Sequence, residues 1–250
     1  AYERDYTVLL CNSDENPLKE RLYLDIMISE RVAGVIVTPA RETNNYSQVV
    51  VKAGIPVVAV DRRMLDLKVD TVVVDSTEGA YRAVEHLLRL GHRRIAFIGG
   101  PPEVMTAQER KEGYLAALRQ FGIPPDPALI RTTDYKLEGG YRATSEVLEL
   151  DHPPTAIFAA NNLTTLGALN CIHEKDLRIP GDVAIVGFDD MPWSTSLNPP
   201  LTAVAQPAYE LGRTAASLLL QRIKQPDREV VEVKLSSRLI VRKSCGETSS

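Results

Sequence analysis

The sequence has no excess of positive charge and no hydrophobic run of membrane-spanning length. Its 250 residues include 29 Lys and Arg against 33 Asp and Glu, which gives a formal net charge of −4. A nucleic-acid-binding surface favours a basic balance, and this chain does not have one. The apolar runs reach about six to eight residues, whereas a membrane helix needs roughly 20, and no secretory signal is recognisable. We therefore predict no membrane partner and no direct contact of these residues with nucleic acid.

Cysteine is also scarce. Only Cys11, Cys171 and Cys245 are present, and they lie far apart in the chain. An odd number of widely separated cysteines is typical of unpaired thiols in a reducing compartment and not of a disulfide framework. The cysteine content therefore predicts a cytoplasmic location.

The motifs of common enzyme classes are missing. There is no G-x-S-x-G nucleophile elbow, no P-loop and no G-x-G-x-x-G after a strand. The four histidines have no partner at the spacing of a metal site; they are His86, His92, His152 and His173. We therefore predict no catalytic residue, no bound metal and no cofactor.

Short apolar runs alternate with longer helical stretches along the chain. The runs are almost continuously apolar, as strands of a parallel sheet covered on both faces should be. They lie at 6–11, 34–38, 55–60, 71–74, 94–100, 155–160 and 183–188. Helices are predicted at 76–91, 106–121, 162–176 and 207–224. Repeated strand–helix–strand units predict an α/β fold with doubly wound parallel sheets.

Local signals refine this pattern at its helix starts and at its C-terminal end. Asp75 and Glu78 resemble a capping box before the first of these helices. A late pair of strands, 229–237 and 238–243, follows the last long helix and could return to an earlier sheet. The strand count is high for one small domain, which favours two lobes. The last residues, 244–250, are predicted to be disordered.

Polar side chains follow most of the predicted strands. In open α/β sheets, ligands bind beyond the carboxyl ends of the strands. These side chains include positively charged donors, negatively charged acceptors and an aromatic ring, but no nucleophile–base pair. Such a set suits hydrogen bonding to hydroxyls and stacking on a ring face. The residues at these positions are therefore candidates for a ligand-binding site: Asp61, Arg62, Thr106, Arg110, Asn161, Asp189, Trp193 and Gln206.

The candidates also have plainer interpretations. The stretch IVGFDDMPW, 185–193, places Asp189 beside Asp190 at the end of a strand. Such a pair could form a metal site, an acid/base pair, a contact to a polar ligand or an ordinary turn. Asp61 could be an ordinary turn residue, and Arg110 could form a surface ion pair. Asn161 or Asn162 could cap the helix that follows, and Asn162 suits that role better by type. Trp193 could be a core or interface residue.

Four longer segments resemble the lactose-repressor (LacI/GalR) family of transcription regulators. They read LLRLGHRRIAFIGGPPEVMTAQERKEGYLAAL, PTAIFAANNLTTLGAL, RIPGDVAIVGFDDMPW and NPPLTAVAQPAYELGRTAASLL. The segments follow one another in the order and spacing of the family, and the resemblance covers nearly the whole chain. Periplasmic sugar-binding proteins share the fold but rarely this full series.

The resemblance implies an effector domain of the type I periplasmic-binding-protein-like fold. Two doubly wound α/β lobes would be joined by three strand crossovers, with the ligand between them. The expected lobes are 1–75 plus 206–234 and 76–205 plus 235–250. The start of the chain resembles the end of the family's first effector-domain helix. The first strand and the basic helix-turn-helix DNA-binding domain are therefore expected to be absent from this chain.

The resemblance also implies effector contacts at matching positions. Arg110 and Asp189 are the strongest candidates, because a guanidinium offers a planar fork of donors and a carboxylate can accept from two hydroxyls. Tyr135 and Trp193 are candidates for the ring face. Asn162 departs from the family, which usually has Asp there, so no carboxylate contact is expected at 162. The full set of implied contacts is Asp61, Thr106, Arg110, Tyr135, Asn161, Asp189 and Gln206, and Asp190 is expected to be a turn or capping residue.

These features predict the ligand-sensing domain of a transcription regulator that acts as a repressor. Its partners would be a small effector, operator DNA bound through the N-terminal domain, and a second copy in a homodimer. The effector would be a sugar, a sugar derivative, a nucleobase or a nucleoside. One alternative is a periplasmic sugar-binding protein of a transport system, which a signal peptide in place of a helix-turn-helix would reveal. An enzyme acting on a sugar or nucleotide is the other, and turnover of a bound ligand would reveal it.

Overall fold

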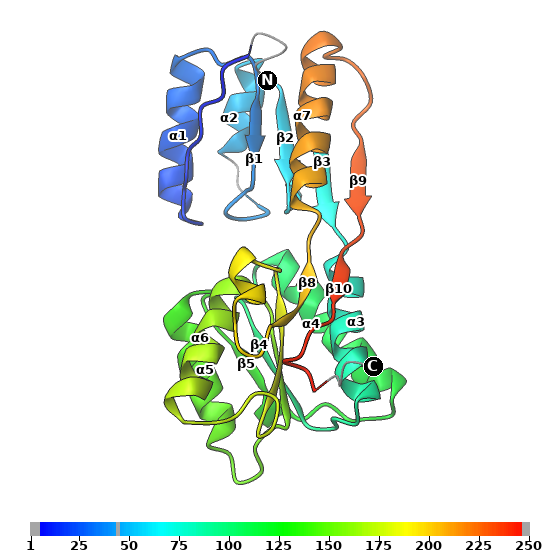
Figure 1. The fold of residues 1–250 in the computed structure, drawn as a ribbon. Helices are drawn as coiled ribbons and strands as arrows, with labels where there is room; N and C mark the ends of the chain where they lie inside the picture. Colours follow the sequence, from blue (N-terminus) through cyan, green and yellow to red (C-terminus); the bar gives the residue numbers. More distant parts are fainter. Residues whose placement is uncertain (1–5, 44–45, 247–250) are drawn as a thin grey trace. The chain divides into compact units, whose positions relative to one another are not determined.

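The computed structural model describes residues 6–43 and 46–246. The chain divides into two compact units (Figure 1). Unit 1 comprises Ala1–Val73 and Tyr209–Val233, and unit 2 comprises Val74–Ala208 and Lys234–Ser250. The chain therefore passes from one unit to the other three times.

Unit 1 is built on a four-stranded sheet in the order β1-β2-β3-β9. Its strands are β1 (Val35–Val37), β2 (Val57–Val60), β3 (Asp70–Val74) and β9 (Glu232–Leu235), and β1, β2 and β3 are parallel. The helices are α1 (Pro17–Ser29), α2 (Ser47–Lys52) and α7 (Ala208–Lys224). The core consists of small and medium-sized aliphatic side chains, as expected where helices pack on a parallel sheet: Leu24, Val35, Val50, Ile55, Val57, Ala59 and Met64.

Asp70 is a fully buried charge in unit 1. Its carboxylate accepts hydrogen bonds from Nε and Nη2 of Arg222, both at 3.0 Å, and from Nη2 of Arg228 at 2.5 Å. The backbone N–H of Val231 donates to it at 2.9 Å. Asp70 therefore ties the start of β3 to α7 and to the segment that leads into β9.

Unit 2 is built on a six-stranded sheet in the order β10-β8-β7-β6-β4-β5. Its strands are β4 (Ile95–Gly99), β5 (Ile130–Thr132), β6 (Ala156–Ala159), β7 (Ala184–Phe188), β8 (Thr202–Ala205) and β10 (Arg238–Ile240). All neighbouring strands are parallel except β10, which is antiparallel to β8. The carboxyl ends of β4 to β8 therefore share one edge of the sheet.

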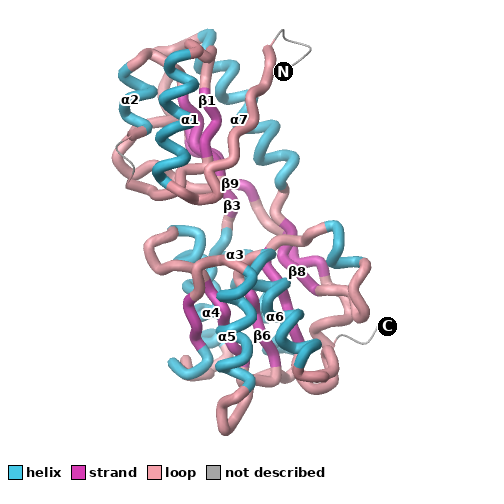
Figure 2. Tube along the Cα trace, turned by 90° about the vertical axis from the view of Figure 1, so that its left-hand side faces the viewer, coloured by secondary structure: helices cyan, strands magenta, loops and turns pink. Residues whose placement is uncertain are grey.

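Helices cover both faces of this sheet. They are α3 (Ser76–Arg89), α4 (Met105–Gln120), α5 (Leu137–Leu148) and α6 (Asn162–Glu174). One core cluster joins α3 and α4 to the sheet and a second joins α5 and α6, which lie side by side across the strands (Figure 2). Every residue of β4, β6 and β7 is buried. The α/β prediction is confirmed, because central strands covered on both faces have the continuous apolar runs that the sequence shows.

Half of the predicted capping box of α3 is present, because Glu78 pairs with Arg82 and the Asp75 N–H donates to the Leu235 carbonyl. Asp75 is its N-cap, and its Oδ1 accepts a hydrogen bond of 3.0 Å from the backbone N–H of Glu78. Burial tends to raise the pKa of Asp75, but the hydrogen bonds from Lys234 and from that N–H outweigh it, so the pKa lies below its ordinary value.

The two late strands return to earlier sheets, as the sequence suggested, although not as a pair: β9 joins the sheet of unit 1 and β10 that of unit 2. Two other expectations at the ends of the chain were wrong. Residues 6–11 form no strand and Val8, Leu9 and Leu10 are exposed, because no described strand lies beside them to satisfy their backbone groups. Ser244 and Cys245, expected to be disordered, are buried, and Ser244 Oγ donates to the Ile185 carbonyl at 2.7 Å. Residues 247–250 lie outside the described residues.

Candidate functional site

The polar candidates of unit 2 gather at the carboxyl edge of its sheet. This is the edge where open α/β sheets bind ligands. The candidates follow the parallel strands β4 to β8 or lie in the first turns of the helix after a strand, so side chains distant in sequence come together here. Contacts between them form one connected series from α4 through β7 to β8.

Arg110 lies at the centre of this series. It sits on α4 and is only 4% exposed. Its Nη1 donates to the Ala160 carbonyl, just beyond β6, at 2.7 Å. Its Cζ lies 3.9 Å from the ring centroid of Phe188, the last residue of β7, which is a cation–π contact. The alternative of a surface ion pair is therefore wrong, and the guanidinium is held in one place by the ends of two strands.

Asp189 follows Phe188 directly. Its φ of 76° is in the left-handed region, which turns the chain sharply at the strand end. Its backbone N–H donates to the Val204 carbonyl of β8 at 2.9 Å. Its Oδ1 accepts a hydrogen bond of 2.5 Å from Nε2 of Gln206. The carboxylate and the amide therefore form a preorganised pair at the tips of two adjacent strands.

Asp190 has a different role from its neighbour. Its two oxygens accept hydrogen bonds from Nη1 and Nη2 of Arg242, at 2.7 and 2.8 Å. These bonds lower the pKa of Asp190 below its ordinary value, although partial burial opposes them. Arg242 also donates to the Leu201 carbonyl at 2.6 Å. Asp190 thus holds the C-terminal segment to the sheet, as an ion-paired residue and not as the turn or helix cap expected from the sequence.

The Asp190–Arg242 pair gives a stability test. Because its folded pKa is depressed, the stabilising contribution of Asp190 is present at neutral pH and is lost as the pH falls through that pKa, below the ordinary value of about 4. We expect Asp190→Asn to lower the free energy of unfolding at pH 7 by about 1.5–3 kcal/mol, the usual contribution of hydrogen bonds to charged groups. Urea unfolding at pH 7 and pH 3 should show this difference shrinking in acid. Asp151→Asn, at an exposed carboxylate, is the control, and equal effects of the two substitutions at pH 7 would contradict the prediction.

Tyr135 and Asn161 extend the cluster toward β5. Asn161 Nδ2 donates to the Tyr135 carbonyl at 3.5 Å, and its Oδ1 caps α6 by accepting from the Thr164 N–H at 2.8 Å. Tyr135 is nearly buried and has a φ of 60°. Its ring packs on Gly100 at the end of β4, where an added Cβ would lie 2.1 Å from the ring. Asn161 is the cap, so the preference for Asn162 was wrong.

Thr106 and Trp193 also lie in unit 2. Thr106 is buried in the first turn of α4, the helix that carries Arg110. Trp193 lies in a short 3-10 helix, Pro192–Thr195, and packs half-buried against the core under α5 and α6. Part of its ring is therefore already occupied by the core. Its role as a ring-stacking contact stays a prediction.

Asp61 and Arg62 belong to unit 1 and follow β2. Asp61 has a φ of 67°, and its backbone N–H donates to the Val72 carbonyl at 2.9 Å. The buried Arg62 donates to Glu15 at 2.8 Å and to the Pro39 carbonyl at 3.4 Å. Its guanidinium therefore holds two neighbouring loops of unit 1, while Asp61 offers a partly exposed carboxylate.

The cluster in unit 2 suits reversible binding of a polar molecule. It offers guanidinium, amide and carboxylate groups held by their own hydrogen bonds. In the described part of the chain, no group of three or more His, Cys, Asp or Glu could hold a metal ion. No helix in residues 6–43 and 46–246 is long and apolar enough to span a membrane.

Two supporting residues of the cluster were not predicted from the sequence. Phe188 supports Arg110, and Arg242 supports Asp190. For Phe188, the only signal was its position just before the two aspartates.

Comparisons with known proteins agree with this architecture. Residues 84–245 match the family model described as a periplasmic binding protein-like domain. The chain is 32% identical over 245 residues to the HTH-type transcriptional repressor PurR of Pasteurella multocida, covering 98% of this chain and 73% of that protein. Among solved structures, it is similar to the transcription regulator CcpA of Lactococcus lactis, with a TM-score of 0.89, 27% identity, and 97% and 89% of the two chains covered. A LacI family transcriptional regulator from Enterococcus faecium with bound ribose gives a TM-score of 0.86, 32% identity, and 97% and 88% coverage.

Proposed function

Because this chain belongs to the LacI family of transcription regulators and corresponds to the effector-binding part of a repressor, we propose that the polar cluster of unit 2 binds its effector. The effector would be a small molecule rich in hydroxyl groups, a sugar, sugar derivative or nucleoside. Arg110, Asp189 and Gln206 would make the principal contacts, with Tyr135, Asn161 and Thr106 around them.

The observation that carries the proposal is the fixed geometry of Arg110 and Asp189. The guanidinium rests on Phe188, and the carboxylate of the next residue is held by Gln206. A charged donor and a charged acceptor, each held by its own contacts, thus lie at the same edge of the sheet, and neither must be ordered when a ligand arrives. Preorganised charged groups of this kind favour vicinal hydroxyls, which can donate to the carboxylate and accept from the guanidinium.

Calorimetric titration of the chain with a panel of sugars and nucleosides tests the proposal. We include ribose, since the similar Enterococcus faecium regulator was solved with bound ribose. We expect saturable binding of at least one panel member at a ratio of one per chain. The matched deoxy analogue should bind more weakly, because a buried polar group then loses its partner. Binding that is indifferent to every hydroxyl would contradict a polar effector site.

In the whole regulator, we propose that the effector changes operator affinity. The chain itself is acidic, with a net charge of −4, so DNA contact would depend on a separate basic domain, such as the HTH element in the name of the Pasteurella multocida relative. An effector shifts a conformational equilibrium only by its difference in affinity for the two states. A cytoplasmic location fits this role, and among the described residues none of the three cysteines takes part in a disulfide.

We also propose that the regulator is a homodimer that uses the exposed face of α1. Leu18, Leu22 and Ile26 recur every four residues along this helix and are 77%, 56% and 47% exposed. Large apolar side chains aligned on one helix face are typical of an interaction surface. Symmetric dimers are the commonest soluble oligomers, which favours a second copy as the partner.

Leu22→Glu tests the dimer surface. It should weaken dimerisation by more than about tenfold, because burying an unpaired carboxylate costs several kcal/mol. Sedimentation velocity over a concentration series measures the monomer–dimer equilibrium. Leu65→Glu, at a 65% exposed leucine of unit 1 outside α1, is the matched control. A wild-type chain that stays monomeric, or a Leu22→Glu variant that dimerises like wild type, would rule out this surface.

A further inference from the structure

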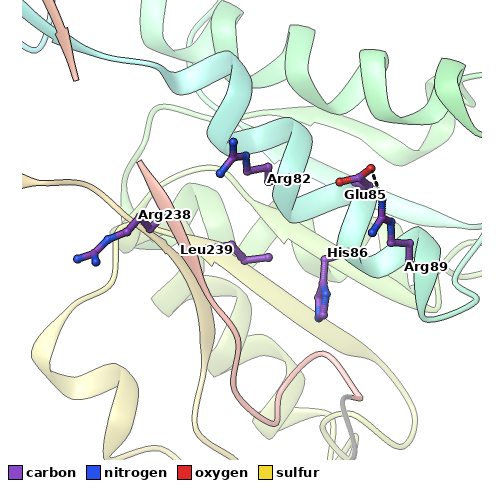
Figure 3. A pocket seen from close by; sticks show the side chains of 6 residues that line it. All are labelled: Arg82, Glu85, His86, Arg89, Arg238 and Leu239. Carbon is purple, nitrogen blue, oxygen red and sulfur yellow. Dashed lines mark hydrogen bonds and ion pairs between the residues drawn. The ribbon is translucent and has the colours of Figure 1, made fainter. Parts of the chain in front are cut away.

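A cavity lies in unit 2 between α3 and the edge strand β10. It has a volume of about 380 Å³ and is open to solvent. Four of its lining side chains come from α3 and two from β10 (Figure 3): Arg82, Glu85, His86, Arg89, Arg238 and Leu239. None of them belongs to the effector cluster at the strand tips. The cavity is therefore a separate feature of the fold.

The lining residues of α3 share one helix face. Arg82, Glu85, His86 and Arg89 follow the i, i+3, i+4, i+7 spacing, which places side chains on the same side of a helix. The core-facing stripe of α3 is formed by other positions, among them Ala83, Leu87 and Leu88. The side of α3 that borders the cavity is thus charged along about two turns. Leu239 closes the apolar side of the cavity and packs against the core.

The charge of the cavity is positive. Three guanidinium groups and an imidazole line it, against the single carboxylate of Glu85. Arg89 pairs with Glu85 at 2.9 Å, and Arg82 pairs with Glu78 at 2.6 Å. Both pairs lie within one helix and have an exposed arginine, and ion pairs with exposed partners contribute little to stability. The net charge of the lining residues stays positive even when the carboxylate of Glu78 is counted with them.

Arg238 supplies that uncompensated charge. Within the described residues, its side chain makes no ion pair or hydrogen bond, although its backbone is fixed by pairing with Ala205 of β8. It therefore presents its guanidinium on a rigid strand. Across the cavity, Nε2 of His86 lies 3.3 Å from the Sγ of the buried Cys245, which fixes the orientation of the imidazole.

From these observations we propose that the cavity between α3 and β10 is a binding site for a phosphorylated small molecule. Arginine side chains present paired N–H donors that match phosphate oxygens, and several of them around one cavity favour a doubly charged anion. The volume is near the lower end of the range for small-molecule sites, about 300–1,000 Å³, which suits a compact metabolite and not a folded partner. The phosphate group would bridge Arg89 or Arg82 of α3 and Arg238 of β10.

Such a ligand would act on elements next to two chain crossings. The helix α3 begins at Ser76, just after the crossing at 73–74, and β10 begins at Arg238, just after the crossing at 233–234. A dianion held by both elements would fasten them to each other. The site would thus give the regulator a second input that is chemically distinct from a neutral effector.

Calorimetric titration with glycerol 3-phosphate and with pyrophosphate tests this site, with glycerol as the neutral control and sulfate as the control for any anion. We expect saturable binding of at least one phosphate probe, no binding of glycerol, and at least tenfold weaker binding by Arg89→Gln/Arg238→Gln. Arg178→Gln is the matched control: Arg178 is an exposed arginine of unit 2 that is paired with Asp182 at 2.7 Å and lies outside the cavity. Its phosphate affinity should equal that of wild type.

Two outcomes would overturn the proposal. One is that sulfate binds with the same affinity as the phosphates, and that Arg89→Gln/Arg238→Gln and Arg178→Gln lose phosphate affinity equally. This outcome would indicate an adventitious ion only. The other is absence of saturable phosphate binding in the millimolar range. If the double variant is misfolded by circular dichroism, NMR of the wild-type chain decides. Phosphate-induced shifts should then concentrate on α3 and β10, and shifts confined to other elements would also refute the site.

Discussion

Asp189→Asn should weaken effector binding at least tenfold while the adjacent substitution Asp190→Asn leaves it unchanged. Asp189 offers its carboxylate at the tip of β7, and losing one charge-assisted hydrogen bond costs about 1.5–3 kcal/mol, where 1.4 kcal/mol is a factor of ten. Asparagine tolerates the left-handed backbone of this position, so the turn is kept. Asp190 has both oxygens occupied by Arg242. The comparison thus separates two neighbouring carboxylates by their roles.

Arg110→Met should have the larger effect, about 100-fold, because a guanidinium can lose two charge-assisted hydrogen bonds at once. Methionine keeps an apolar contact with Phe188 and fills much of the same space. Calorimetry with the best ligand of the sugar and nucleoside panel measures all three variants, and circular dichroism checks their folding. Wild-type affinity in Asp189→Asn and Arg110→Met, or an equal loss in Asp190→Asn, would refute the assigned contacts.

Asp70→Ala should destabilise the chain by about 3–5 kcal/mol, the cost of removing one partner from a buried ion pair. Asp70 is fully buried, and Arg222 and Arg228 are only 11% and 16% exposed in their side chains. Removing the carboxylate leaves both guanidinium groups without their charged partner and the N–H of Val231 without its acceptor. The expected consequence is loss of contact between β3, α7 and the segment before β9.

Urea unfolding of Asp70→Ala measures this cost. Glu210→Gln is the control on the same helix, because its pair with Arg213 is exposed and should contribute less than about 1 kcal/mol. A double variant, Asp70→Ala with Arg222→Met, should lose less than the sum of the two single variants, since the second substitution removes an unpaired charge. A loss of no more than the control value would show that the network is not important for stability.

The central strands could be predicted from the sequence because burial on both faces leaves an unambiguous pattern. The runs at 94–100, 155–160 and 183–188 contain β4, β6 and β7. The edge strand β5 was missed, because Ile130–Thr132 is short and only partly buried. The run at 6–11 has the same composition as a true strand but lacks a neighbour. Composition indicates the propensity for a strand, whereas pairing decides whether one forms.

In the candidate site, too, local sequence patterns could be interpreted but contacts between distant segments could not. The rule that ligands bind at strand ends predicts from the sequence alone that Arg110, Asp189 and Gln206 share one edge of the sheet. The partner of Asp190 could not be found in this way, because Arg242 lies 52 residues further along the chain, after a return to unit 2. Contacts between distant segments depend on how the chain re-enters a unit, and a local motif contains no information on that.

The central claim is that the polar cluster of unit 2 holds the effector. An electron-density map of the chain crystallised with the sugar or nucleoside identified by calorimetry tests it most directly. We predict ligand oxygens within hydrogen-bonding distance of the Arg110 guanidinium and the Asp189 carboxylate. A ligand that contacts neither residue, for example one seated between α3 and β10, would contradict the claim.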